Sequence, residues 1–252
     1  MTMTPDEVYR TVMTIDPPAV ETPFEAASRE FLFGNVWNRP GLSIRDRRLV
    51  SLACVAAADA PKPIDDHVYA ALRSGDLTIE QMNEVTLQFA VYCGWPKGSH
   101  LEMTVRTQWH RIHAERGEQT PPWPTRTPED LGPADPAQRI LDGQWEFADV
   151  NVVPAPPSDS PYFYAGILNF VFGHVWRRPD LSRRDRRLVT IPCVGLSDSP
   201  APILSHVGSA LETGDVTYDE MQEICLQFSA YYGFAKGEAL QDAAERWRLG
   251  KA

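Results

Sequence analysis

The chain has 252 residues, 43% of them hydrophobic, and its 34 acidic and 24 basic residues give a formal net charge of −10. This length fits one large domain or two ordinary ones, and the apolar content is enough for a buried core, which argues against general disorder. The acidic balance disfavours a nucleic-acid or anionic-membrane surface, and no apolar run is long enough to cross a bilayer.

The four cysteines, Cys54, Cys93, Cys193 and Cys225, are scattered and form no Cys-x-x-Cys pair. This usage predicts reduced thiols in a cytoplasmic protein and argues against a zinc site or a disulfide framework. The first residues do not resemble a signal peptide. We therefore expect no metal and a cytoplasmic location.

Helix start and stop signals follow one another along the first half. Short helices are expected after Thr4 and Thr22, and a longer one from Ser43 through Val55. The next helix carries His67 and ends at Gly75. Further helices are expected over about 78–92 and 99–114, and no strand-like alternation is seen.

The same pattern returns at a constant offset of 139 residues. More than half of the positions in 31–98 are identical to those in 170–237. Between the copies, ten of the 22 prolines lie in a segment interrupted by one short helix at about 137–147. The prediction is a first domain over 1–117, a Pro-rich connector over 118–160 and a second domain over 161–252.

His67 and its repeat partner His206 each border the apolar face of their helix. Such a histidine is either a satisfied core residue or a proton donor or acceptor near neutral pH. Their recurrence in both copies keeps the second interpretation open.

A polar stripe with apolar flanks occupies the helix that follows. Its acidic members are Glu84 and Glu223, and Tyr92 and Tyr231 lie eight residues further on. The flanks predict that the stripe is buried, so each carboxylate needs a partner, whether a histidine, an arginine or a neighbouring subunit. Structural ion pairing and catalysis are both compatible with this pattern.

Arginines are concentrated just before and within the helix that precedes each histidine. They form either an exposed first turn with local ion pairs or a clamp for a substrate carboxylate. The candidate substrate-binding arginines are Arg39, Arg45, Arg48, Arg178, Arg184 and Arg187. Trp37 and Trp176, just upstream, are aromatic residues for a core, an interface or a substrate pocket.

These motifs in this order, from Val36-Trp37-Asn38-Arg39-Pro40 through His67 and Glu84 to Tyr92-Cys93-Gly94-Trp95-Pro96, resemble the carboxymuconolactone decarboxylase family. The resemblance covers about 31–98 and again 170–237. It implies an all-α fold, hexamers in single-domain members, and cofactor-free decarboxylation of a lactone acid in aromatic catabolism.

The sister branch of alkylhydroperoxidase D-like proteins carries a Cys-x-x-Cys just before the histidine. This chain has Ala60 and Pro63 there, and Ser199 and Pro202 in the second copy, so thiol peroxidase chemistry is not expected. The decarboxylases usually have an acidic residue where Pro63 and Pro202 stand. Pro192 also lies inside a predicted helix of the second copy, which must therefore be kinked or shortened.

The sequence thus predicts an all-α tandem duplication of a small helical bundle of the carboxymuconolactone decarboxylase and alkylhydroperoxidase D-like type. The predicted activity is decarboxylation of a small carboxylate-bearing lactone or enolisable cyclic acid without a cofactor. The alternative is a non-catalytic oligomerising or small-molecule-binding protein that kept the fold. The predicted catalytic residues are His67, His206, Glu84 and Glu223, and the predicted substrate-binding residues are Arg39, Arg45, Arg48, Trp37, Tyr92, Arg178, Arg184, Arg187, Trp176 and Tyr231.

The expected assembly is a homotrimer with six domains in pseudo-sixfold arrangement, since three two-domain chains supply the domains of a hexamer. The rival arrangement is a monomer whose two copies pack only on each other.

Overall fold

The structure is a computed structural model that describes residues 3–125, 135–197 and 199–250. Every regular element within these ranges is a helix, which confirms the predicted all-α fold. The helices of the first half are α1 (Pro5–Met13), α2 (Pro23–Ala27), the π-helix η1 (Ser28–Trp37), α3 (Ile44–Ala58), α4 (Pro61–Ser74), α5 (Ile79–Cys93) and α6 (Trp95–Glu115).

The predicted caps begin and end these helices. The Ser43 hydroxyl accepts a hydrogen bond from the Asp46 amide at 3.0 Å and starts α3, and Gly75 ends α4 with φ of 77°. Helix α6 begins four residues earlier than expected, at Trp95. Gly94, with φ of 94°, separates it directly from α5, and Pro96 suits the first turn of a helix.

The second half repeats this order. Its helices are α7 (Pro136–Asn151), the π-helix η3 (Tyr162–Phe172), the 3₁₀ turn η4 (Val175–Arg177), α8 (Arg183–Gly195), α9 (Pro200–Glu212), α10 (Tyr218–Tyr232) and α11 (Phe234–Arg248). The bounds of α10 lie 139 residues after those of α5 at both ends. Helix α8, which contains Pro192, has 13 residues where α3 has 15, so the predicted shortening is observed.

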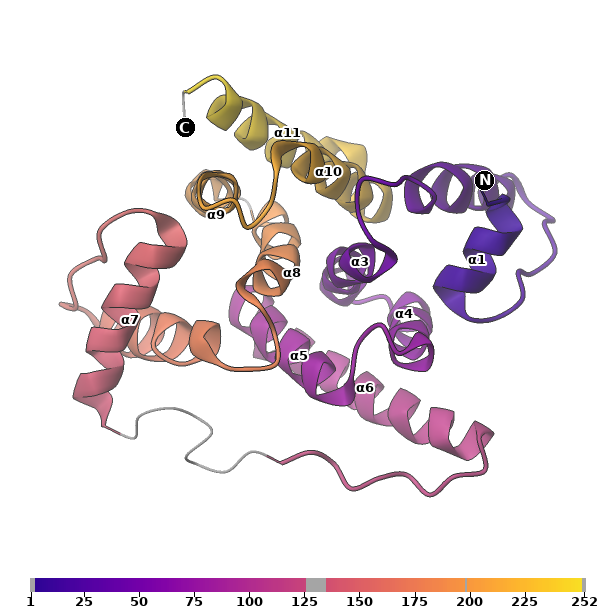
Figure 1. Ribbon diagram of the computed structural model, residues 1–252, viewed down its shortest axis with the longest axis horizontal. Coiled ribbons are helices and arrows are strands. Elements are labelled where there is room, and N and C mark those ends of the chain that lie inside the picture. Colours follow the sequence, from indigo (N-terminus) through magenta and orange to yellow (C-terminus); the bar gives the residue numbers. More distant parts are fainter. Residues whose placement is uncertain (1–2, 126–134, 198, 251–252) are drawn as a thin grey trace.

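Helix α7 includes the short helix that the sequence predicted within the connector. It packs on η3 and α9, as α1 packs on η1 and α4 in the first half. In Figure 1, α1 and α7 lie at opposite ends of the molecule. Each copy therefore has a helix covering its π-helix, while the domain boundaries given above remain a prediction.

The two copies share one hydrophobic core. Helices α3 and α8 lie side by side at the centre of Figure 1 and are in contact. Val50 and Leu52 belong to the same buried cluster as Val189 and Ile191. Helix α10 also packs on α3, and α5 packs on α8. The helix that carries Glu84 or Glu223 in one copy therefore contacts the helix that begins with arginines, α8 or α3, in the other copy.

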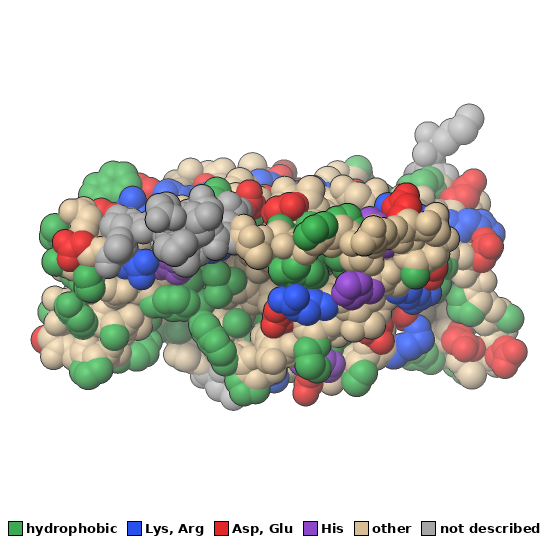
Figure 2. Space-filling view, turned by 90° about the horizontal axis from the view of Figure 1, so that it is seen from below, with side chains coloured by type: hydrophobic (Ala, Val, Ile, Leu, Met, Phe, Trp, Pro, Cys, Tyr) green, Lys and Arg blue, Asp and Glu red, His purple; other side chains and the backbone are tan. Residues whose placement is uncertain are grey.

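The surface mixes charge and apolar groups. Figure 2 shows side chains of both signs among hydrophobic ones on the face seen from below Figure 1. Trp95 and Phe234, 139 residues apart, are exposed by 58% and 61%. No helix in the described ranges is both long and apolar enough to cross a membrane.

Candidate functional site

His67 lies on the buried face of α4 between two aromatic rings. The Trp37 ring, from the end of η1, stacks on it at 6.3 Å and 14°, and the Tyr231 ring of α10 meets it edge-on at 5.1 Å. The Trp37 Nε1–H donates to the Tyr231 hydroxyl at 2.9 Å. The first copy thus supplies the histidine and the tryptophan, and the second copy supplies the tyrosine.

Arg48 completes this group, which we call the first cluster: His67, Trp37, Tyr231 and Arg48. Its buried guanidinium donates to the Asp76 carboxylate at 2.6 Å and to the Thr11 carbonyl at 3.3 Å. Within this cluster two buried polar atoms have no hydrogen-bond partner among the described residues, Arg48 Nη1 and His67 Nδ1. Unsatisfied buried groups of this kind are costly and are typical of positions where a ligand or water binds.

The second cluster has the same composition with the copies exchanged: His206, Trp176, Tyr92 and Arg187. Trp176 stacks on His206 at 6.1 Å and 5°, and Tyr92 meets that ring edge-on at 5.4 Å. The Trp176 Nε1–H donates to the Tyr92 hydroxyl at 2.9 Å. Each cluster therefore needs both halves of the chain.

One position distinguishes the two clusters. Arg187 Nη1 donates to the Ser209 hydroxyl at 2.9 Å. The residue 139 positions earlier is Ala70, which has no hydroxyl, and the corresponding Arg48 Nη1 is unpartnered. In the first cluster the Arg48 Nη1 group can therefore still donate to a ligand, whereas in the second cluster the equivalent group of Arg187 is hydrogen-bonded to Ser209.

Burial strongly affects the protonation of both histidines. Burial, and then the positive charge of Arg48, lower the pKa of His67 to about 3, and burial and Arg187 do the same for His206. Both imidazoles are neutral at pH 7. Burial also raises the pKa of Tyr231 and Tyr92, so both phenols keep their protons.

The stripe carboxylates lie in ion pairs that join the copies. Glu223 accepts hydrogen bonds from Arg39 at 2.8 Å and from the fully buried Arg47 at 2.7 Å. Burial alone would raise the pKa of Glu223, but these two arginines hold it below its usual value. Glu84 accepts a bond of 2.7 Å from Arg178 in the mirrored pair.

The predicted partner for each stripe carboxylate is therefore an arginine, and it comes from the other copy. Arg47 belongs to the arginine cluster seen in the sequence, but neither it nor its counterpart Arg186 was among the predicted substrate-binding residues. They donate to Gln227 and Gln88 at 3.0 Å.

Two of the predicted clamp arginines also pair with carboxylates of the opposite copy: Arg45 donates to Asp185 at 2.6 Å, and Arg184 donates to Asp46 at 3.0 Å. Arg184 also donates to Glu220 of its own copy at 2.7 Å. The structure thus brings together the predicted residues in three kinds of group: the histidine clusters, the Glu–Arg pairs and these Arg–Asp pairs.

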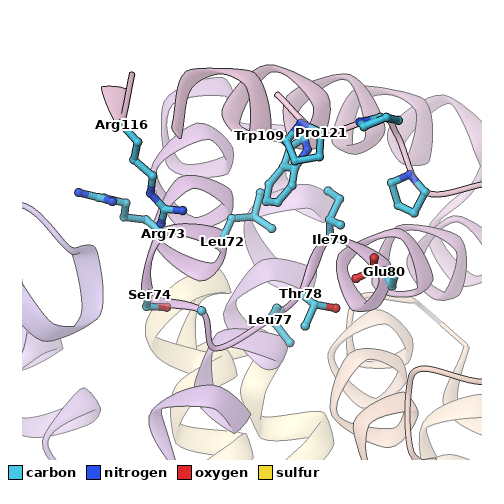
Figure 3. A pocket seen from close by; sticks show the side chains of 13 residues that line it. Leu72, Arg73, Ser74, Leu77, Thr78, Ile79, Glu80, Trp109, Arg116 and Pro121 are labelled. Carbon is cyan, nitrogen blue, oxygen red and sulfur yellow. The ribbon is translucent and has the colours of Figure 1, made fainter. Parts of the chain in front are cut away.

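The larger cavities lie away from the histidines. Figure 3 shows one of about 550 Å³ beside the end of α4, lined by Leu72, Arg73, Trp109 and Arg116 among others. It contains no predicted site residue. Neither histidine lines any of the cavities of about 190–550 Å³. No three His, Cys, Asp or Glu side chains gather as a metal ion would require within the described ranges.

Comparison with known proteins relates part of the chain to decarboxylases. Residues 23–101 match the sequence model of the carboxymuconolactone decarboxylase family. The match covers 79 of the 252 residues. It contains α2 to α5, with Trp37, Arg48 and His67 of the first cluster.

Two relatives resemble part of the chain. The nitrosuccinic acid decarboxylase npaB of Metarhizium robertsii (strain ARSEF 23 / ATCC MYA-3075) is 34% identical over 91 residues, which are 34% of this chain and 62% of the relative. The 4-carboxymuconolactone decarboxylase of Acinetobacter baylyi (strain ATCC 33305 / BD413 / ADP1) is 35% identical over 79 residues, 31% of this chain and 58% of the relative. The matches thus span about three fifths of each relative, and they support a decarboxylase-like function.

Proposed function

We propose that the protein removes carbon dioxide from a small carboxylic acid without an organic cofactor, and that the first cluster is the site. The observation that carries this proposal is the pair of unpartnered buried atoms, Arg48 Nη1 and His67 Nδ1. Both residues lie in the segment that matches the family model, and two relatives of the chain are named as decarboxylases. The guanidinium is a suitable donor for a carboxylate, and the imidazole is a suitable group for moving a proton.

The proposed chemistry uses the surroundings of His67 in two ways. The apolar walls of Trp37 and Tyr231 exclude water, which favours loss of a charged carboxylate whose electrons pass into a delocalised system of the substrate. A carbonyl, a nitro group or a β,γ double bond in the substrate supplies that system. His67 then gives a proton to the carbon that lost carbon dioxide.

The low pKa of His67 sets a condition on this step. In the free protein the imidazolium of His67 has a pKa of about 3, so at pH 7 the ring is neutral and carries no extra proton to give. An anionic substrate beside it offsets the charge of Arg48 and stabilises the imidazolium, so substrate and proton bind together. Access also requires the packing around His67 to open, because its side chain is buried with 7% exposure. Trp37 belongs to a π-helix, an element found frequently at functional sites.

The alternative is a binding protein without turnover. The packed and neutral state of both histidines is the observation that favours it. Two measurements with nitrosuccinic acid and 4-carboxymuconolactone separate the two functions: calorimetric titration for binding, and headspace detection of carbon dioxide for turnover.

Release of carbon dioxide from either acid above the uncatalysed rate supports the enzyme. Binding of both acids with no release above that rate supports the binding protein. If neither acid binds, the proposed substrate class is wrong.

A further inference from the structure

The fold brings two cysteines together that are 100 residues apart in the sequence. Cys93 is the last residue of α5, and Cys193 lies in the last turns of α8, on which α5 packs. The two thiols influence each other: Cys193 lowers the pKa of Cys93, and Cys93 raises the pKa of Cys193. Neither cysteine is in a disulfide.

A small cavity gives access to this pair. Both cysteines line a space of about 200 Å³, together with Lys97 and Tyr232. Cys93 is partly exposed, while Cys193 is buried with 3% exposure. A cavity of this size holds several water molecules, at about 30 Å³ each, and therefore admits a small hydroperoxide.

The two sulfurs differ in character. The hydrogen bond between the two thiols lowers the pKa of Cys93 against the effect of burial, and the ammonium of Lys97 adds to this. Burial and the same hydrogen bond raise the pKa of Cys193. A cysteine with a lowered pKa beside a cysteine whose thiol stays protonated suits stepwise disulfide formation, in which the first sulfur attacks and the second resolves.

We propose that Cys93 and Cys193 form an oxidation-sensitive dithiol that closes to a disulfide joining the two copies when a hydroperoxide reaches the cavity. This inference is independent of the proposed decarboxylation. It also differs from the Cys-x-x-Cys arrangement, which the sequence lacks.

The reaction balances in two steps. The Cys93 thiolate attacks the terminal oxygen of the hydroperoxide, the O–O bond breaks, and the departing alkoxide takes a proton to give an alcohol and a Cys93 sulfenic acid. The Cys193 sulfur then attacks the Cys93 sulfur, the S–S bond forms, and the hydroxide leaves as water with the Cys193 proton. The two thiols give up two electrons, and the hydroperoxide accepts them.

The duplication offers an internal control. The positions equivalent to Cys93 and Cys193 are Tyr232 and Cys54, so the repeat carries a phenol where the attacking sulfur would be. Cys54 is fully buried, and burial raises the pKa of its thiol. We therefore expect the Cys93 and Cys193 pair to react with a hydroperoxide and the equivalent Tyr232 and Cys54 positions not to react.

The test treats the reduced full-length protein with one equivalent of hydrogen peroxide, followed by blocking of free thiols and non-reducing peptide mapping by mass spectrometry. We expect a Cys93–Cys193 cross-linked peptide that dithiothreitol removes. The Cys225→Ser and Cys54→Ser variants should still form it, because neither cysteine belongs to the proposed pair and the Cys54 side chain is fully buried. The Cys93→Ser variant should lose the cross-link and react with peroxide at least tenfold more slowly.

Two results would overturn the proposal. One is a wild-type protein that keeps all four thiols at this dose, and the other is a cross-link that involves Cys54 or Cys225 instead of the pair. The wild-type map decides the question alone if a variant fails to fold, which circular dichroism would show.

Discussion

At the scale of single residues, the two clusters differ by one hydroxyl group, that of Ser209. Ser209 satisfies Arg187 Nη1, whereas Ala70 leaves Arg48 Nη1 free. Ala70→Ser should place a hydroxyl where Arg48 can donate to it. Because a hydrogen bond to a charged group is worth about 1.5–3 kcal/mol, we expect a carboxylate to bind at least tenfold more weakly, as measured by calorimetric titration with nitrosuccinic acid. Ser209→Ala serves as the matched control and should not weaken binding; equal losses in both variants would contradict the assignment to Arg48.

The histidines also predict how stability depends on pH. Their folded-state pKa of about 3 lies below the ordinary value of 6.5, so below pH 6.5 the unfolded chain binds protons that the folded chain does not. The free energy of unfolding should therefore fall as pH is lowered from about 6.5 towards 3, by up to about 1.4 kcal/mol per pH unit for each histidine.

Urea unfolding between pH 7 and 5 measures this slope before most carboxylates titrate. The variant with both His67→Gln and His206→Gln should show a clearly flatter dependence. A slope unchanged by the double substitution would mean that neither histidine is buried and neutral.

At the scale of helices, the Glu–Arg pairs hold the copies together. Glu223→Gln would leave Arg47, which is fully buried, without its charged partner. Removal of one member of a buried ion pair costs about 3–5 kcal/mol. Arg47 keeps its existing bond to Gln227, so its guanidinium is not left without any partner.

The control for this prediction is Glu102→Gln on α6. Its partner is Arg106, both side chains are 46% exposed, and such a pair is worth about 0.3–0.5 kcal/mol. The midpoints of urea unfolding measure the loss of stability in both variants, Glu223→Gln and Glu102→Gln. Similar small losses in the two variants would show that the Glu223 pair does not stabilise the fold.

The helices themselves were largely predictable because caps and periodicity are local signals. Thr4, Ser43, Thr78 and Gly75 mark ends that the structure confirms. The apolar flanks of Glu84 correctly indicated burial. Which copy supplies the arginine partner of Glu84 was not predictable, since no local pattern shows that Arg178 of the other copy binds this carboxylate. For the same reason the sequence could not show that Tyr92 packs on His206 rather than on His67.

At the scale of the whole molecule, the two copies pack on each other and share a core, and the assembly of chains remains a prediction. Trp95 and Phe234 are exposed at equivalent positions, which is compatible with further contacts between chains. We expect a trimer, with a mass by light scattering near three times 28.3 kDa at micromolar concentration. A mass near one chain that does not rise with concentration would leave the internal pair as the complete assembly.

The central claim is that His67 moves the proton in a decarboxylation within the first cluster. The most direct measurement is the turnover rate for carbon dioxide release, compared between the wild type, His67→Gln, His206→Gln and the control His110→Gln, whose side chain is exposed. We predict that His67→Gln lowers turnover by about 10²–10⁴, that His206→Gln lowers it less, and that His110→Gln leaves it unchanged. A folded His67→Gln protein with wild-type turnover would contradict the account.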